Sequence, residues 1–158
     1  MEPQFRYLPE GYHSVTPLLV VKDFSESIDF YKRAFNAREI YRIEAGPNMT
    51  HAELAIGDSR FMLCSENPER GWLSPATLHN NSCGLYLYVE EVDRAFDQAI
   101  RAGGKALLSP MDMFWGDRMG ELFDAAGHRW SLATRKENLS SEEIHRRAEE
   151  YFASQAKR

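Results

Sequence analysis

The sequence predicts an α+β fold in which two copies of a βαβββ unit form a curved sheet around a central cleft, followed by a C-terminal helix. Three observations support this prediction. A strand, a helix and three further strands are predicted twice, the two copies keep a nearly constant spacing, and a polar connection separates them. With 158 residues, 43% of them hydrophobic, the chain is long enough for one domain with a substantial core.

The first copy of the unit follows residues 1–13, which are rich in aromatic residues and proline and which we expect to be irregular. Residues 15–21 form an apolar run of strand length. Apolar residues then recur at helical spacing over residues 26–37, with Ser25 as the expected N-cap. Three short strands separated by glycine-containing turns complete the copy: residues 38–43, 50–56 and 60–64.

The second copy begins after a polar connection, residues 66–82, that contains two prolines. Residues 84–89 read as a strand, and residues 92–102 read as an amphipathic helix that ends at Gly103-Gly104. Three more strands are predicted after this helix: residues 105–108, 120–123 and 129–133.

The two copies are related by a spacing of 68 residues. Leu18–Phe24 aligns with Tyr86–Val92, and the same spacing places Glu53 on Glu121. After one additional residue in a turn, Phe61–Leu63 aligns with Trp130–Leu132. A spacing that holds through a strand, a helix and a hairpin favours a true internal repeat. Two unrelated α+β segments of similar periodicity remain the alternative.

The tail of the chain is predicted to form a final helix over residues 140–156. Ser140 and Glu143 have the spacing of a capping box, and Tyr151 and Phe152 belong to an apolar stripe that we expect to pack on the domain or on a partner subunit. The predicted organisation is therefore a single domain, residues 1–158. It is divided into a half over 14–65, the connection 66–82, a half over 83–135 and the tail helix.

Charge, cysteine content and hydropathy exclude several classes of partner. The net charge of −5 gives no general attraction to nucleic acid or to anionic membranes, and no apolar run reaches the roughly 20 residues that span a bilayer. Cys64 and Cys83 form neither a metal-type pair nor a disulfide framework. Free thiols and the lack of a secretory leader favour a cytoplasmic protein.

Several sequence motifs, added to the repeat, resemble those of a known family. They lie at residues 30–35 (FYKRAF), 51–59 (HAELAIGDS), 88–93 (YVEEVD), 115–118 (WGDR) and 127–134 (GHRWSLAT). Together they resemble the vicinal oxygen chelate superfamily of glyoxalases, bleomycin-resistance proteins and dioxygenases, and in particular its PhnB-like branch. The resemblance covers residues 14 to about 150. One departure is Asp124-Ala125-Ala126-Gly127, where relatives usually have Asp-Pro-Phe-Gly.

The resemblance also implies where a metal would bind. Its metal-ligand positions fall on Thr16, Met62, Gly84 and Ser131, which lack the imidazole, thiolate or carboxylate that Zn, Ni or Fe needs. We therefore expect no metal at the usual site and predict no cofactor. His51 and Glu53, which alternate on one face of a strand, are the remaining candidates for a displaced site. Hydrogen bonding within the sheet is their alternative role.

The candidate ligand-binding residues are one charged side chain and several aromatic ones, beside His51 and Glu53. Arg118 has the fork that grips an anionic or carbonyl group, although it could equally pair with Asp117 or Glu121. Aromatic walls suit a flat or hydrophobic ligand, and ordinary core packing is the alternative. The aromatic candidates are Tyr86, Tyr88, Trp115 and Trp130.

These observations leave three hypotheses for function. The first is a protein that binds a small aromatic or hydrophobic molecule in its cleft without a metal. The second is a metal-dependent lyase, isomerase or dioxygenase with a displaced site at His51 and Glu53. The third is a non-enzymatic interaction protein. We expect a homodimer in each case.

Overall fold

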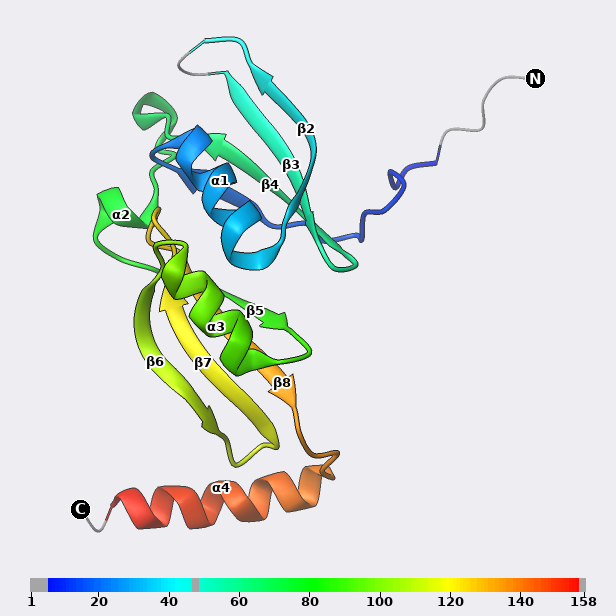
Figure 1. The fold of residues 1–158 in the computed structure, drawn as a ribbon, viewed down its shortest axis with the longest axis vertical. Coiled ribbons are helices and arrows are strands. Elements are labelled where there is room, and N and C mark those ends of the chain that lie inside the picture. Colours follow the sequence, from blue (N-terminus) through cyan, green and yellow to red (C-terminus); the bar gives the residue numbers. More distant parts are fainter. Residues whose placement is uncertain (1–5, 47–48, 157–158) are drawn as a thin grey trace.

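The computed structural model describes residues 6–46 and 49–156 and shows two βαβββ halves stacked along the long axis of the molecule (Figure 1). Each half is a four-stranded mixed sheet with a long helix on one face. The predicted α+β fold, with two repeats and a C-terminal helix, is confirmed. In this part of the chain, no helix is long and apolar enough to cross a bilayer.

The first half has the strand order β1-β4-β3-β2, with β1 parallel to β4 and the other neighbours antiparallel. Its helix buries one apolar face against the sheet, because hydrophobic residues recur every three or four positions. The elements are β1 (Leu18–Val21), α1 (Phe24–Phe35), β2 (Arg38–Glu44), β3 (Thr50–Ile56) and β4 (Ser59–Ser65).

The second half repeats this topology as β5-β8-β7-β6 and is linked to the first by a connection with two short helical turns. The final helix, α4, lies across the far end of the second half (Figure 1). The elements are η1 (Pro68–Arg70), α2 (Pro75–Leu78), β5 (Gly84–Tyr88), α3 (Val92–Arg101), β6 (Lys105–Asp112), β7 (Asp117–Phe123), β8 (Arg129–Arg135) and α4 (Ser141–Gln155).

The strand registers show the repeat at the level of single residues. Met62 lies opposite both Leu18 and Glu53, and in the second half Ser131 lies opposite both Tyr86 and Glu121. The paired positions are those that the spacing of 68 or 69 residues relates. A repeat that was visible only as a sequence pattern is therefore also a repeat of backbone pairing.

Several predicted boundaries are wrong, and two of the differences have a clear physical cause. The first helix begins two residues early, because the N-cap is Asp23, whose carboxylate accepts the backbone N–H of Glu26 at 2.9 Å, and Ser25 lies inside the helix. The β6–β7 hairpin is also longer than predicted. β6 continues through Pro110 because it is an edge strand, where a missing N–H costs no ladder bond, and irregular register accommodates the bend.

An aromatic cluster joins the two halves. Tyr31 and Phe35 come from α1, Phe61 comes from β4, and Trp130 comes from β8; all four are buried. The ring centroids of Phe35 and Trp130 lie 4.7 Å apart, and those of Tyr31 and Phe61 lie 5.3 Å apart in an edge-to-face arrangement. Such contacts stabilise beyond the burial of area alone.

A buried carboxylate lies within this cluster. Asp124 accepts the Tyr31 hydroxyl at 2.6 Å and the Trp130 indole N–H at 3.0 Å on one oxygen. Its other oxygen accepts the backbone N–H groups of Ala126 and His128, and the His128 ring nitrogen lies 3.2 Å from the first oxygen. Burial alone would raise the pKa of Asp124, but the His128 ring and these donors outweigh burial and hold it below its ordinary value.

Asp124→Asn should destabilise the fold. The amide carries no charge, and it has one oxygen to accept the hydrogen bonds that the two carboxylate oxygens of Asp124 now accept. We expect the free energy of unfolding at pH 7, from urea denaturation, to fall by about 3 kcal/mol. A lowered folded-state pKa stabilises the protein above the ordinary Asp pKa of about 3.9, and that stability is lost as pH falls through the folded value. The wild type should therefore weaken in this acid range more than the variant does.

Tyr31→Phe is the matched control, because it keeps the ring and removes a single donor. It should cost about 1 kcal/mol and preserve the acid dependence. An Asp124→Asn variant as stable as the wild type would contradict the central role of this carboxylate.

Candidate functional site

A cleft of about 670 Å³ lies between the two halves. It runs along β1 and β5, each of which is an edge strand of its sheet, and the connection closes one side through Leu73, Pro75 and Leu78. Its size falls in the range of small-molecule sites. Apolar side chains dominate the lining, and the polar ones include His13, Arg60, Asn80 and His128.

The predicted aromatic candidates contribute to this cleft unequally. Tyr86 lines the cleft with its ring about half exposed. Trp130 also borders it, but its side chain is almost wholly buried in the aromatic cluster between the halves and its N–H is bound to Asp124. Trp130 therefore forms part of the floor of the cleft.

A second groove, of about 680 Å³, lies next to the cleft and shares Tyr86 with it. Tyr88 lines this groove together with residues from the start of α3. Its charged lining consists of three carboxylates and one guanidinium: Asp58, Glu90, Glu91 and Arg94. The groove therefore carries an excess of negative charge.

Three aromatic side chains of the second half meet at one carboxylate. Asp117 is 5% exposed, and one of its oxygens accepts the hydroxyl of Tyr86 at 2.9 Å, that of Tyr88 at 3.1 Å and the indole N–H of Trp115 at 3.3 Å. Burial and the hydrogen bond to Asp117 raise the pKa of Tyr86 to about 12, and the same causes raise the pKa of Tyr88. Both tyrosines are therefore neutral donors at pH 7.

Arg118 lies apart from both cavities and is held by carboxylates other than the two anticipated from the sequence. Its guanidinium donates to Asp93, at the start of α3, at 2.7 and 2.8 Å, and to Asp112, at the end of β6, at 3.2 Å. These bonds raise the pKa of Arg118. The pairing with Asp117 or Glu121 is not formed, and a contact between Arg118 and a ligand stays a prediction.

His51 and Glu53 lie on the face of the first sheet that points away from α1, and neither lines the cleft or the groove. The His51 ring is 3.5 Å from the Glu53 carboxylate, which also accepts the hydroxyl of Tyr12. The Arg60 guanidinium stacks over the Tyr12 ring at 4.8 Å. Burial, and then the bond to Glu53, raise the pKa of Tyr12.

Sequence reasoning missed both buried carboxylates. Asp117 and Asp124 lie in motifs that the sequence singled out, but the tyrosines that they bind come from elements far along the chain. His128, at the turn beside Gly127, is 6% exposed, because Asp124 binds both its ring and its backbone N–H. The sequence signal that could have revealed this burial is the spacing of four residues between Asp124 and His128 at the turn.

The matched family model, that of the Glyoxalase/Bleomycin resistance protein/Dioxygenase superfamily, covers residues 12–132. The chain belongs to this superfamily. An uncharacterized protein of Mycobacterium bovis is 35% identical over 136 residues, covering 83% of this chain and 89% of the relative. An uncharacterized protein of Mycobacterium tuberculosis is equally similar, covering 83% of this chain and 79% of the relative.

Solved structures of the superfamily share the fold at lower identity. The fosfomycin resistance protein FosX of Listeria monocytogenes, complexed with Mn(II) and sulfate, is 18% identical, with a TM-score of 0.63 over 86% of this chain and 97% of that one. TioX of Micromonospora sp. ML1 is 21% identical, with a TM-score of 0.60 over 81% of this chain and all of that one. These likenesses concern the fold.

The positions where the superfamily binds metal do not fit a metal here. Met62 and Ser131 lie at equivalent points of the two sheets, but a thioether and a hydroxyl are poor ligands for a divalent transition metal. Thr16 donates to the His13 carbonyl at 3.3 Å, and Gly84 offers no side chain. No group of three or more His, Cys, Asp or Glu side chains gathers among the described residues.

Protein purified without a histidine tag should therefore contain less than stoichiometric Zn, Mn, Fe or Ni after dialysis, as measured by elemental mass spectrometry. His51→Ala should leave that content unchanged. Stoichiometric metal that resists dialysis and disappears in His51→Ala would contradict this expectation and point to a displaced site beside Glu53.

Proposed function

We propose that this protein binds a small aromatic or hydrophobic molecule in the cleft between its halves, without a metal. The single observation that carries the proposal is the cleft itself, whose volume and apolar lining match those of small-molecule sites. Leucine and proline side chains supply the walls, and the Tyr86 ring supplies a flat surface for stacking.

The chemistry of the residues near the cleft supports binding over covalent catalysis. Cys83 lines the cleft, and its thiol lies near the Gly84 carbonyl, which is a weak contact that does not activate a thiol. Cys64, on β4, has its pKa raised by burial, which disfavours the nucleophilic thiolate. Both thiols are free, which suits a reducing, cytoplasmic setting.

We further place the chain in the PhnB-like branch of the superfamily. The motifs behind this placement occupy structurally coherent positions: HAELAIGDS spans β3 and the turn after it, and GHRWSLAT spans the last turn and β8. The Gly127-His128 pair closes the turn that Asp124 organises.

We also propose that the protein acts as a homodimer. The sheet faces turned away from α1 and α3 expose large hydrophobic side chains, among them Tyr41, Ile43 and Met111. Helix α4 buries none of its residues in the chain and exposes Tyr151 and Phe152. Exposed apolar side chains, together with the four edge strands β1, β2, β5 and β6, are typical of surfaces that a second copy covers.

A second candidate function rests on the cluster of His51, Glu53 and Tyr12. A carboxylate with a histidine and a neutral phenol beside it is suited to acid–base chemistry or to a displaced metal, as in a lyase, isomerase or dioxygenase. The same exposed faces that favour a dimer also suit a third candidate, a non-enzymatic interaction protein.

The binding proposal is tested with N-phenyl-1-naphthylamine, a flat uncharged dye that fluoresces in apolar sites. We expect saturable binding, weakened about ten-fold or more in Leu78→Glu, which places a charge in the wall of the cleft. The matched control is Leu107→Glu, because Leu107 is 47% exposed, close to the 55% of Leu78, and lines neither cavity. Equal effects of the two variants, or no binding at all, would overturn the proposal.

For assembly, we expect light scattering at micromolar concentration to give twice the mass of one chain. Removal of residues 140–158 should weaken the dimer without unfolding the halves, because α4 contributes no buried residue to them. A monomeric wild type contradicts the homodimer. A truncated chain with unchanged mass and stability excludes α4 from the interface.

A further inference from the structure

The two buried carboxylates of the second half differ in how their charge is compensated. Asp124 has the His128 ring 3.2 Å away. Asp117, although only 5% exposed, makes no ion pair with any Lys, Arg or His of the described residues, and its recorded side-chain partners are three neutral donors. Burying a carboxylate without an opposite charge is costly, so a cation that approaches it gains binding energy.

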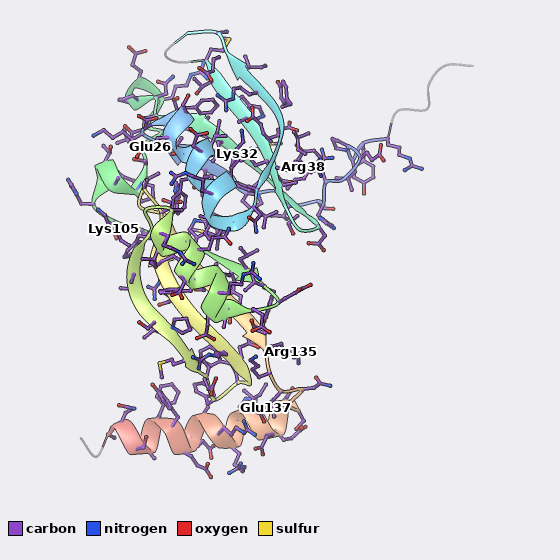
Figure 2. All side chains as sticks on the ribbon, in the orientation of Figure 1. Glu26, Lys32, Arg38, Lys105, Arg135 and Glu137 are labelled. Atoms are coloured by element: carbon purple, nitrogen blue, oxygen red, sulfur yellow. The ribbon has the colours of Figure 1, made fainter. Side chains whose placement is uncertain are left out.

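The neighbouring arginines do not supply that charge. Arg118, which follows Asp117 in β7, directs its guanidinium to Asp93 and Asp112. Arg135, which lies opposite Asp117 on β8, donates to the Glu137 carbonyl and to Asn138, and Figure 2 shows it at the end of β8. Arg118 is held by other carboxylates. Arg135 makes no bond to Asp117, although its positive charge acts on the Tyr88 hydroxyl and works to lower the pKa of that group.

The rings around Asp117 are arranged to receive a cation. Tyr86 is 46% exposed and Tyr88 is 62% exposed, and their ring centroids lie 5.2 Å apart at an angle of 52°. The Trp115 indole N–H reaches the same carboxylate oxygen at 3.3 Å. Neutral aromatic faces attract ammonium groups, and a hydroxyl that donates to a carboxylate makes its ring richer in electrons.

The cavities beside Tyr86 favour a cationic ligand and connect this cluster with the cleft. Tyr86 lines both the apolar cleft and the second groove, and the ionisable lining of that groove is mostly acidic. A molecule with its apolar part in the cleft can therefore place a charged nitrogen over Tyr86 and Tyr88. Both tyrosines are neutral at pH 7, and their hydroxyls donate to one oxygen of Asp117.

We infer that Tyr86, Tyr88, Trp115 and Asp117 form a binding site for an organic cation, such as the ammonium group of an amine or quaternary ammonium compound. This inference rests on the proposed binding function and specifies the chemical class of its ligand: an apolar or aromatic body with a positively charged nitrogen.

The test compares choline with 3,3-dimethyl-1-butanol, an uncharged molecule of nearly the same shape. Binding is followed by NMR through the indole N–H signals of the three tryptophans, with the Trp115 signal assigned from Trp115→Phe. Choline should shift the Trp115 signal saturably and bind about ten-fold more tightly than the alcohol, because only choline carries the charge. Equal binding of the two compounds would overturn the inference.

Two variants and one matched control test the residues. Asp117→Asn should lower the affinity for choline about ten-fold, and Tyr88→Leu should lower it several-fold. Tyr88→Phe, which keeps the ring, should stay within about two-fold of the wild type. Thermal unfolding checks that each variant is folded. If Asp117→Asn does not fold, the two substitutions at the exposed Tyr88 serve as the test: equal affinity for choline in Tyr88→Leu and Tyr88→Phe overturns the site.

The remaining outcomes separate this inference from the broader proposal. Binding of the uncharged dye in the cleft, without a preference for choline, overturns the cation site and leaves the binding function intact. Loss of binding of both probes overturns both. If Asp117→Asn changes the mass in light scattering and not the affinity for choline, Asp117 is a subunit contact and the inference is wrong.

Discussion

The buried carboxylate of Asp124 is the interaction on which the arrangement of the two halves depends. It accepts a hydroxyl from α1 in the first half and an indole N–H from β8 in the second, while its other oxygen fixes the last hairpin turn. Such a charge is tolerated in the interior because each oxygen is bonded and a histidine ring lies beside it. The halves are thus joined through a polar centre surrounded by aromatic rings.

The position of the cleft follows from the same turn. The Ala126 carbonyl accepts the backbone N–H of Ala76 at 2.9 Å, and the Gly127 carbonyl accepts the side chain of Asn81 at 2.5 Å, so the connection is docked on this turn. Gly127 has a φ of +87°, and a Cβ there would lie 2.8 Å from the Ala76 nitrogen. A side chain at this position would push away α2, whose neighbouring residues form the wall of the cleft.

The open faces of the two sheets carry equivalent carboxylates that are already engaged. Glu53 accepts the Tyr12 hydroxyl, and its counterpart Glu121 accepts the guanidinium of Arg129 at 3.2 Å and the hydroxyl of Ser131 at 3.1 Å. Met62 lies opposite Glu53 and Ser131 lies opposite Glu121, so the repeat places these residues at equivalent points of the two sheets. Backbone pairing preserves the fold, whereas side-chain chemistry is free to differ.

The sequence by itself determined the fold, because the fold rests on local and periodic signals. Alternating and helical patterns identified the strands and helices, and the spacing of 68 residues identified the repeat, which the registers of Met62 and Ser131 bear out. Errors arose where tertiary context overrode a local signal. Pro110 sits in an edge strand that needs no donor there, and Asp23 provides a cap in place of the nearby Ser25.

Only the tertiary structure decided which side chains meet. Tyr31 and Asp124 are 93 residues apart, and Tyr86 and Asp117 are 31 apart, so no local pattern pairs them. Arg118 likewise found Asp93, 25 residues away, where nearer carboxylates were anticipated. Hydrogen-bond partners and ion pairs depend on distances of a few ångströms between elements, and a single sequence specifies those distances only through the packing of the whole chain.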